Sequence, residues 1–235
     1  MPADLHTSAT SVILPSTDGF PMRLRLAPAL FAVLLLLAAC SITRGSGQLA
    51  TESRAVSGFS KIDLSGGGEL AIQKTGTESL SISAEDNLLP RLTSEVSNDT
   101  LILGTKPNTT ILPQQPITYT VNVKDLTGVA VSGSGNIRVP DLTTTALSIS
   151  ISGSGTITVN GTVDDQDLEI SGSGGYEAAQ LTSKTVKADI SGSGTANILA
   201  TNVLDVEISG SGTVTYSGNP QIKQEISGSG KLIKK

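Results

Sequence analysis

Four acidic residues occupy one position in successive copies of a short repeat, and they are the strongest candidates for chemistry. Each lies two residues before a Ser-Gly-Ser-Gly tetrapeptide; they are Glu169, Asp189, Glu207 and Glu225. Copies stacked about 5 Å apart would place these carboxylates in one outward-facing column. Such a column offers oxygen ligands for weak Ca²⁺ capture or a carboxylate pair for glycoside hydrolysis. It is equally typical of a solvated face, because Lys187 and Lys223 fall in the neighbouring column and can pair with it.

These alternatives stay open, so we assign no catalytic residue and no metal ligand, and keep the four acids as weak cation candidates. The chain has one histidine, His6, and one cysteine, Cys40. If the chain is cleaved before Cys40, it loses its histidine, which excludes Ser-His-Asp and Cys-His catalysis and ordinary zinc sites. We therefore expect no enzyme activity and no cofactor. The net charge of −5 and the lack of Lys/Arg clusters argue against nucleic acid as a partner.

The N-terminal region has the features of a secretory leader. Arg23 and Arg25 precede an apolar run over residues 26–39, which is short for a membrane-spanning helix and typical of a signal peptide. Leu37-Ala38-Ala39-Cys40 resembles the lipobox of bacterial lipoproteins, which implies lipidation of Cys40 and attachment to a membrane. We expect a leader and lipoprotein signal peptide over 1–39, with Met22 as the more natural start, and a flexible tether over 40–55. In the resembling class, Ser41 after the cysteine implies the outer membrane, with the body facing the periplasm or the cell surface.

Residues 56–235 form the predicted domain, and its fold follows from the repeat. The tetrapeptide begins six times, at steps of 18 to 20 residues: Ser132, Ser152, Ser171, Ser191, Ser209 and Ser227. Apolar residues alternate with polar ones on both sides of each copy, which indicates strands with one buried face. A fixed period of this length predicts stacked coils, here a right-handed parallel β-solenoid. The alternative is a sandwich or barrel of antiparallel hairpins, which leaves the recurrence of the tetrapeptide unexplained.

The alternation also predicts which side chains face the core. It points both glycines of each tetrapeptide inward and both serines outward. It places Tyr176 and Tyr216 inward as well, which disfavours an aromatic sugar-binding face. A weaker copy of the pattern, Ile62 to Gly68, predicts less regular coils in the N-terminal half.

Several segments together carry a family resemblance. The sequence Gly58-Phe59-Ser60-Lys61-Ile62-Asp63-Leu64-Ser65-Gly66, the Asp86–Pro90 segment and the Gly-Ser-Gly repeats resemble the head GIN domain family of auto-transporter adhesins. The resemblance covers about residues 56–235. It implies a β-solenoid-like envelope protein and no established catalytic residues. The lipoprotein leader on a short chain departs from the family's auto-transporter label.

The leading interpretation is a non-catalytic, lipid-anchored envelope protein with an adhesive or structural role. Its partner would be an unidentified protein or glycan, and self-association through the last coil is left open. One alternative is a polysaccharide-acting β-helix enzyme that uses the stacked carboxylates. Another is a periplasmic accessory subunit that docks a partner protein.

Overall fold

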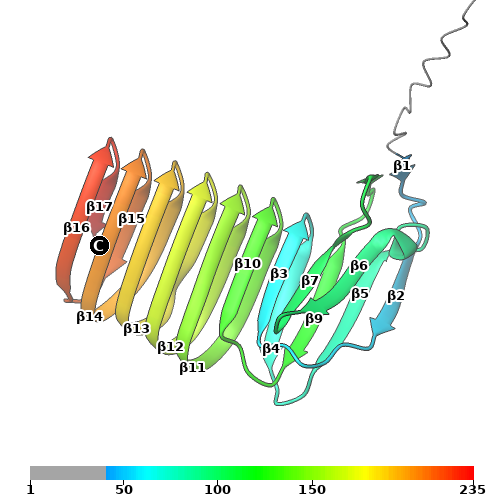
Figure 1. Cartoon of the computed structure of the whole chain (residues 1–235), viewed down its shortest axis with the longest axis horizontal. Helices are drawn as coiled ribbons and strands as arrows, with labels where there is room; N and C mark the ends of the chain where they lie inside the picture. Colours follow the sequence, from blue (N-terminus) through cyan, green and yellow to red (C-terminus); the bar gives the residue numbers. More distant parts are fainter. Residues whose placement is uncertain (1–40) are drawn as a thin grey trace, which may run out of the picture. The chain divides into compact units, whose positions relative to one another are not determined.

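The six tetrapeptides stack into one row of a parallel β-solenoid, as predicted (Figure 1). The computed structural model describes residues 41–235, so the predicted leader and Cys40 lie outside the described residues. Ser132 is in register with Ser152, and the pairing continues coil by coil to Ser227. All strands of the repeats pair in parallel, so the hairpin alternative is wrong for this part of the chain.

Ten strands build the two walls of the solenoid. They are β3 (Lys61–Gly66), β4 (Glu69–Lys74), β10 (Gly128–Gly133), β11 (Asn136–Gly153), β12 (Thr156–Gly172), β13 (Gly175–Gly192), β14 (Thr195–Gly210), β15 (Thr213–Ser217), β16 (Gln221–Gly228) and β17 (Lys231–Lys234). The strands β11 to β14 each continue from one tetrapeptide to the next. Figure 1 shows them side by side between β10 in green and β16 in red.

Each coil bends twice. The sharp bend is the tetrapeptide, and the second bend interrupts the register in the middle of the long strands, between Val139 and Leu142 in β11 and between Thr158 and Asn160 in β12. The pairing is regular before and after this bend, so the bend itself accommodates the extra residues of the longer coils. The variation of the repeat between 18 and 20 residues is therefore absorbed at the second bend.

The two glycines of the tetrapeptide have different roles, which corrects the prediction that both face the core. The second glycine is buried, for example Gly155 and Gly194. The first is partly exposed and has a positive φ, 124° at Gly153. A Cβ added to Gly153 would lie 2.6 Å from the carbonyl oxygen of Gly133 in the preceding coil. The first glycine is thus required by backbone conformation and by close contact between coils.

The core is a set of stacked apolar columns. The residues before each tetrapeptide are in register and buried from Leu64 through Val131, Ile151, Ile170 and Ile190 to Ile208. Burial of each such side chain contributes roughly 1.5–3 kcal/mol. Tyr176 and Tyr216 also face the core, as predicted, with 0% and 8% of their surface exposed.

The N-terminal end differs from the predicted irregular coils because it includes antiparallel strands. Its elements are β1 (Ser41–Arg44), β2 (Leu49–Arg54), β5 (Ser79–Glu85), the 3-10 helix η1 (Leu89–Arg91), β6 (Leu92–Ser97), β7 (Thr100–Thr105), β8 (Thr109–Leu112) and β9 (Thr118–Val123). The strands β7 and β9 continue the two walls in parallel, and then β6, β5 and β2 add antiparallel pairs. Asn98 and Asp99, with φ of 49° and 62°, form the tight turn between β6 and β7.

The predicted tether over 40–55 contains two strands instead. The strand β1 pairs in parallel with β8, and β2 pairs with β5. The turn between β1 and β2 is held by the buried carboxylate of Glu85, which accepts hydrogen bonds from the backbone N–H groups of Gly47 (2.6 Å) and Gln114 (2.8 Å). Small polar residues here therefore serve a tight turn around a buried acid rather than a flexible linker.

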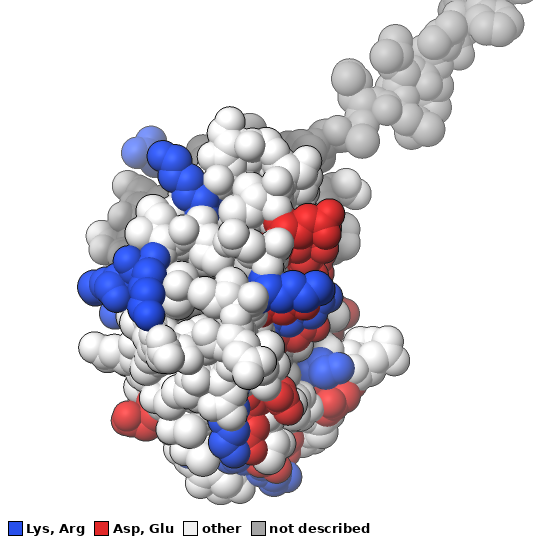
Figure 2. All heavy atoms as spheres, turned by 90° about the vertical axis from the view of Figure 1, so that its left-hand side faces the viewer, with Lys and Arg blue, Asp and Glu red and all other residues white. Residues whose placement is uncertain are grey.

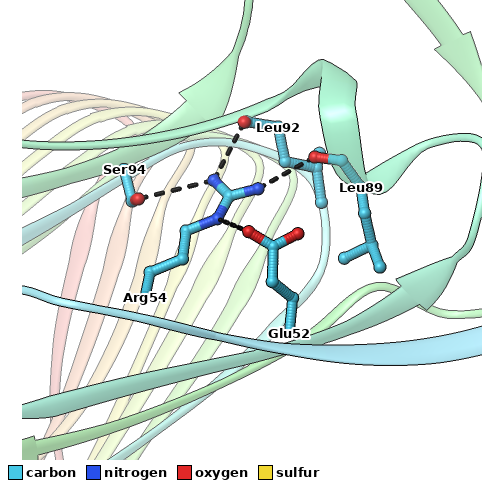
Figure 3. Close-up of polar contacts among 5 residues, drawn as sticks. All are labelled: Glu52, Arg54, Leu89, Leu92 and Ser94. Carbon is cyan, nitrogen blue, oxygen red and sulfur yellow. Dashed lines mark hydrogen bonds and ion pairs between the residues drawn. The ribbon is translucent and has the colours of Figure 1, made fainter.

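Arg54 fastens β2 to η1 and to the start of β6 (Figure 3). Its guanidinium donates to the carbonyl oxygens of Leu89 and Leu92, both at 2.9 Å, and pairs with Glu52 at 3.0 Å. The five donors of a guanidinium can bind several carbonyl groups at once. Arg54 thus joins two segments whose own strands do not pair with each other.

Candidate functional site

The candidate acids lie on one wall of the solenoid, in the column that the sequence predicts. We call Glu169, Asp189, Glu207 and Glu225 the acidic ladder. Successive members are direct partners in the register of β12, β13, β14 and β16. The neighbouring residues on the same strands form a second column, which we call the mixed-charge column: Asp167, Lys187, Asp205 and Lys223. The parallel sheet holds both columns at the coil spacing of about 4.8 Å.

Lysines neutralise part of this surface, as predicted. The Nζ of Lys187 lies 3.0 Å from a carboxylate oxygen of Asp189, and that of Lys223 lies 2.9 Å from one of Asp205. The hydrogen bond and the charge of Asp189 raise the pKa of Lys187, and those of Asp205 raise the pKa of Lys223. These lysines are largely exposed, so the pairs contribute little to stability. They reduce the electrostatic repulsion between the carboxylates on this face.

Part of the two columns lines a shallow groove with a volume of about 530 Å³: Glu169, Asp189 and Glu207 from the acidic ladder, and Asp167 and Lys187 from the mixed-charge column. Its walls combine carboxylates of the acidic ladder with the hydroxyl groups of Ser150, Ser191 and Ser209. Parallel strands repeat this chemistry along the face, so the groove offers an array of acceptors and hydroxyl donors. Such a surface is suited to a polar partner that contacts several coils.

Among residues 41–235, the acid with a raised pKa does not form a carboxylate pair with the acidic ladder. The acid with a raised pKa is Asp63, which heads the same column, in register with Ala130. Burial raises its pKa, and a hydrogen bond from Ser132 partly offsets this. Ala130 and Ser150 separate Asp63 from Glu169, so three coil steps, about 14 Å, lie between the two acids. Glycoside hydrolysis needs two carboxyl groups about 5–9.5 Å apart.

The ladder does not form a cation cage either. Within residues 41–235, no group of three or more Asp, Glu, His or Cys side chains is placed to hold a metal ion. The candidates Glu169, Asp189, Glu207 and Glu225 follow one another along a line instead of converging on one point. A calcium ion takes six to eight oxygen ligands around it, which a single column does not supply.

Aromatic side chains of the solenoid face the core rather than the groove. Tyr119 and Tyr176 are buried, and burial raises the pKa of Tyr119 to about 12. Stacking of sugar rings requires an exposed aromatic face. We call the wall that carries the acidic ladder and the mixed-charge column the polar wall; its groove presents hydroxyl and charged groups.

A second hollow, of about 550 Å³, lies at the first corner and was not anticipated from the sequence. Gly66, Gly67 and Gly68 form one side, and Ile111, Ile117 and Tyr119 contribute to its lining. The corner glycines are visible in the sequence, but the strand β8 beside them pairs with β1, which is far away in the chain.

The position of Asp63, in contrast, could have been predicted, because Lys61 to Gly66 fits the repeat and aligns Asp63 with the acidic ladder.

The chain has relatives of the same fold. A family model described as "Putative auto-transporter adhesin, head GIN domain" matches residues 58–220. A "putative adhesin" from Bacteroides fragilis is 25% identical with a TM-score of 0.64, and the match covers 81% of this chain and 98% of that one. A "putative adhesin" from Parabacteroides distasonis is 21% identical with a TM-score of 0.56, over 83% of this chain and 100% of that one.

A "putative lipid binding protein" from Parabacteroides distasonis is 24% identical with a TM-score of 0.52, covering 83% of this chain and 99% of that one. No curated protein matches the chain. Among residues 41–235, no helix is long and apolar enough to cross a membrane.

Proposed function

Since the chain belongs to the head GIN domain family of auto-transporter adhesins, we propose that it is a non-catalytic adhesion module anchored to the bacterial envelope through a lipid on Cys40. Family membership confirms the resemblance carried by the segments from Gly58 to Gly66 and by the repeats. An adhesin domain belongs to the cell envelope or surface. The lipobox at Leu37 to Cys40 supports the anchor.

The observation that carries the proposal is the regularity of the polar wall. The acidic ladder and the serines beside it repeat at the same spacing over successive coils, and the groove between them is open and shallow. An enzyme needs convergent groups in a site that excludes water. An adhesive surface needs the same contact many times, because weak contacts made together give strong attachment.

Attachment of cells tests the role of the wall. Cells carrying the full chain are allowed to settle on polystyrene and on a layer of cells that lack it. The variant Glu169→Lys/Glu207→Lys reverses charge on the polar wall, and we expect a several-fold loss of attached cells. The matched control is Glu177→Lys, an exposed acid on the wall that follows the corner, where Asn197 donates to it at 2.7 Å. Equal attachment by all three chains would overturn the adhesive role of this wall.

The anchor is tested separately by fractionation and proteolysis. The full chain should sediment with membranes, whereas Cys40→Ser should appear in the soluble fraction. Protease added to intact cells should digest a chain that faces outward and spare one that faces the periplasm. Membrane retention of Cys40→Ser would contradict lipid anchoring, and full protection in intact cells would contradict a role in adhesion to external surfaces.

A further inference from the structure

Within residues 41–235, the strands β16 and β17 each pair along one edge only. The strand β16 pairs with β14, and β17 pairs with β15, and within residues 41–235 no strand covers their other edges. Ile222 and Ile226 on β16 are 44% and 38% exposed, whereas Ile190 and Ile208 in the same column as Ile226 are buried. Figure 2 faces this end and shows a largely uncharged centre with lysines and acids at its border.

The exposed edge borders a shallow hollow at this end of the solenoid. A hollow of about 490 Å³ is lined by Tyr216, Ile222, Gln224, Leu232 and Lys234. Free strand edges with apolar side chains favour the addition of another strand. The strand β17 carries Lys231 and Lys234 and no acid, which discourages strand addition on that wall. On β16, Lys223 is accompanied by Glu225, so β16 is the edge better suited to pairing.

The sequence of β16 is complementary to itself in the antiparallel direction. We propose that this edge binds the same edge of a second copy of this chain, with the two-fold axis at Gln224. In that register Lys223 lies opposite Glu225 of the second copy, and Ile222 lies opposite its Ile226. The opposite-charge contact and the apolar contact then each occur twice, as a two-fold interface requires.

In this antiparallel arrangement, the inward and the outward side chains of β16 both meet suitable side chains of the second copy. Ile222 and Ile226 continue the inward columns of β14, in register with Leu204 and Ile208. Antiparallel pairing keeps inward side chains on the inward side, so Ile222 of one copy lies beside Ile226 of the other on the side that faces the core. Parallel in-register pairing of two copies would instead place Lys223 against Lys223 and Glu225 against Glu225, which like-charge repulsion disfavours.

Cysteine cross-linking of the full chain in its host membranes tests the two-fold axis. Opposed residues in an antiparallel pair have Cα atoms about 4.5–5.5 Å apart, which suits a disulfide. Gln224→Cys should therefore form a dimer with its own copy under mild oxidation, read on a non-reducing gel. The unsubstituted chain, which has only Cys40, sets the background, and Glu177→Cys is the control for collision at another exposed site.

Charge reversal tests the register. Added to Gln224→Cys, either Lys223→Glu or Glu225→Lys should lower the cross-linked yield about tenfold, since each creates two like-charge contacts. The pair Lys223→Glu/Glu225→Lys should restore it. Cross-linking no greater than Glu177→Cys, or a yield that single reversals leave unchanged or that the pair fails to restore, would overturn the proposal. Melting of each variant checks that the coil itself remains folded, because Lys223 also pairs with Asp205.

Discussion

The two glycines of the tetrapeptide show how little room separates one coil from the next. The first adopts a backbone conformation that other residues avoid, and the second lies under the isoleucine of the preceding coil. A Cβ on Gly194 would lie 2.5 Å from the Cγ2 atom of Ile170. The recurrence of Gly at these positions is therefore a packing requirement of the fold.

Gly194→Ala should lower the free energy of unfolding by about 1–3 kcal/mol, because Ile170 and the backbone beside it must move to admit the methyl group. Gly175→Ala is the matched control. A Cβ there meets nothing closer than 3.5 Å, so its stability should stay the same or rise slightly. Urea denaturation followed by circular dichroism measures both, and equal midpoints would contradict the role of Gly194.

Asp63 is the one acid on the polar wall whose charge is disfavoured by burial. Its pKa is raised above the ordinary value of 3.8, and one of its carboxylate oxygens is buried without a hydrogen-bond partner among the described residues. A raised pKa means that the group favours folding fully below pH 3.8, and that this contribution is lost as pH rises through the folded value.

Asp63→Asn should therefore melt at a higher temperature than the original chain at pH 7, and the difference should vanish as pH falls toward 3. The asparagine keeps the shape and the acceptor for Ser132 but carries no charge to desolvate. Glu95→Gln, an exposed acid on β6, should change the melting temperature little. A variant that is less stable at pH 7 would show that the charge of Asp63 is instead favourable.

At the scale of the elements, the long strands are stabilised by columns, and a polar residue in a column is a local weakness. Gln166 lies in the inward column with Leu147, Val186 and Leu204. Its carbonyl oxygen accepts a hydrogen bond from the hydroxyl of Ser183 at 2.9 Å, but its buried amide nitrogen has no partner among the described residues. A buried donor without a partner costs about 1–3 kcal/mol.

Gln166→Leu should raise the free energy of unfolding by about 1 kcal/mol. It removes the unpaired nitrogen and continues the apolar column, while Ser183 keeps the carbonyl of Leu181 as an acceptor at 3.4 Å. Gln180→Leu, at an exposed position of β13, serves as the control and should change stability by less than about 0.5 kcal/mol. A destabilised Gln166→Leu would mean that the Gln166–Ser183 contact is needed as it stands.

The elements differ in how much the sequence discloses about them. In the repeats, six copies of one pattern identify the strands, their register, the buried tyrosines and the acidic ladder. The N-terminal end has no repeat, so the pairing of β1 with β8, the acceptor role of Glu85 and the contacts of Arg54 depend on residues far apart in the chain. The turn at Asn98 and Asp99, by contrast, involves neighbouring residues and joins β6 to β7 locally.

At the scale of the whole molecule, each coil touches mainly its neighbours, so stability should be close to a sum over coils. Deleting residues 187–204 joins Val186 to Asp205, the residue that takes the place of Lys187 in the next coil. We expect this chain to fold with one coil fewer and with a lower unfolding midpoint.

Deleting residues 187–203 is the matched control. It joins Val186 to Leu204 after the second bend, so Leu204, Val206 and Ile208 change face and their burial in the apolar columns is lost. Circular dichroism and cooperative urea unfolding distinguish the two chains. Equal behaviour of both deletions would contradict the dependence of the fold on coil register.

The identical corners have a consequence for how such proteins can diverge. An insertion or deletion that runs from one corner to the next adds or removes one whole coil and leaves the hydrophobic pattern intact. The length of the solenoid would then change in steps of one coil, about 4.8 Å each. Related proteins can thus differ in length while the side-chain contacts between coils stay the same.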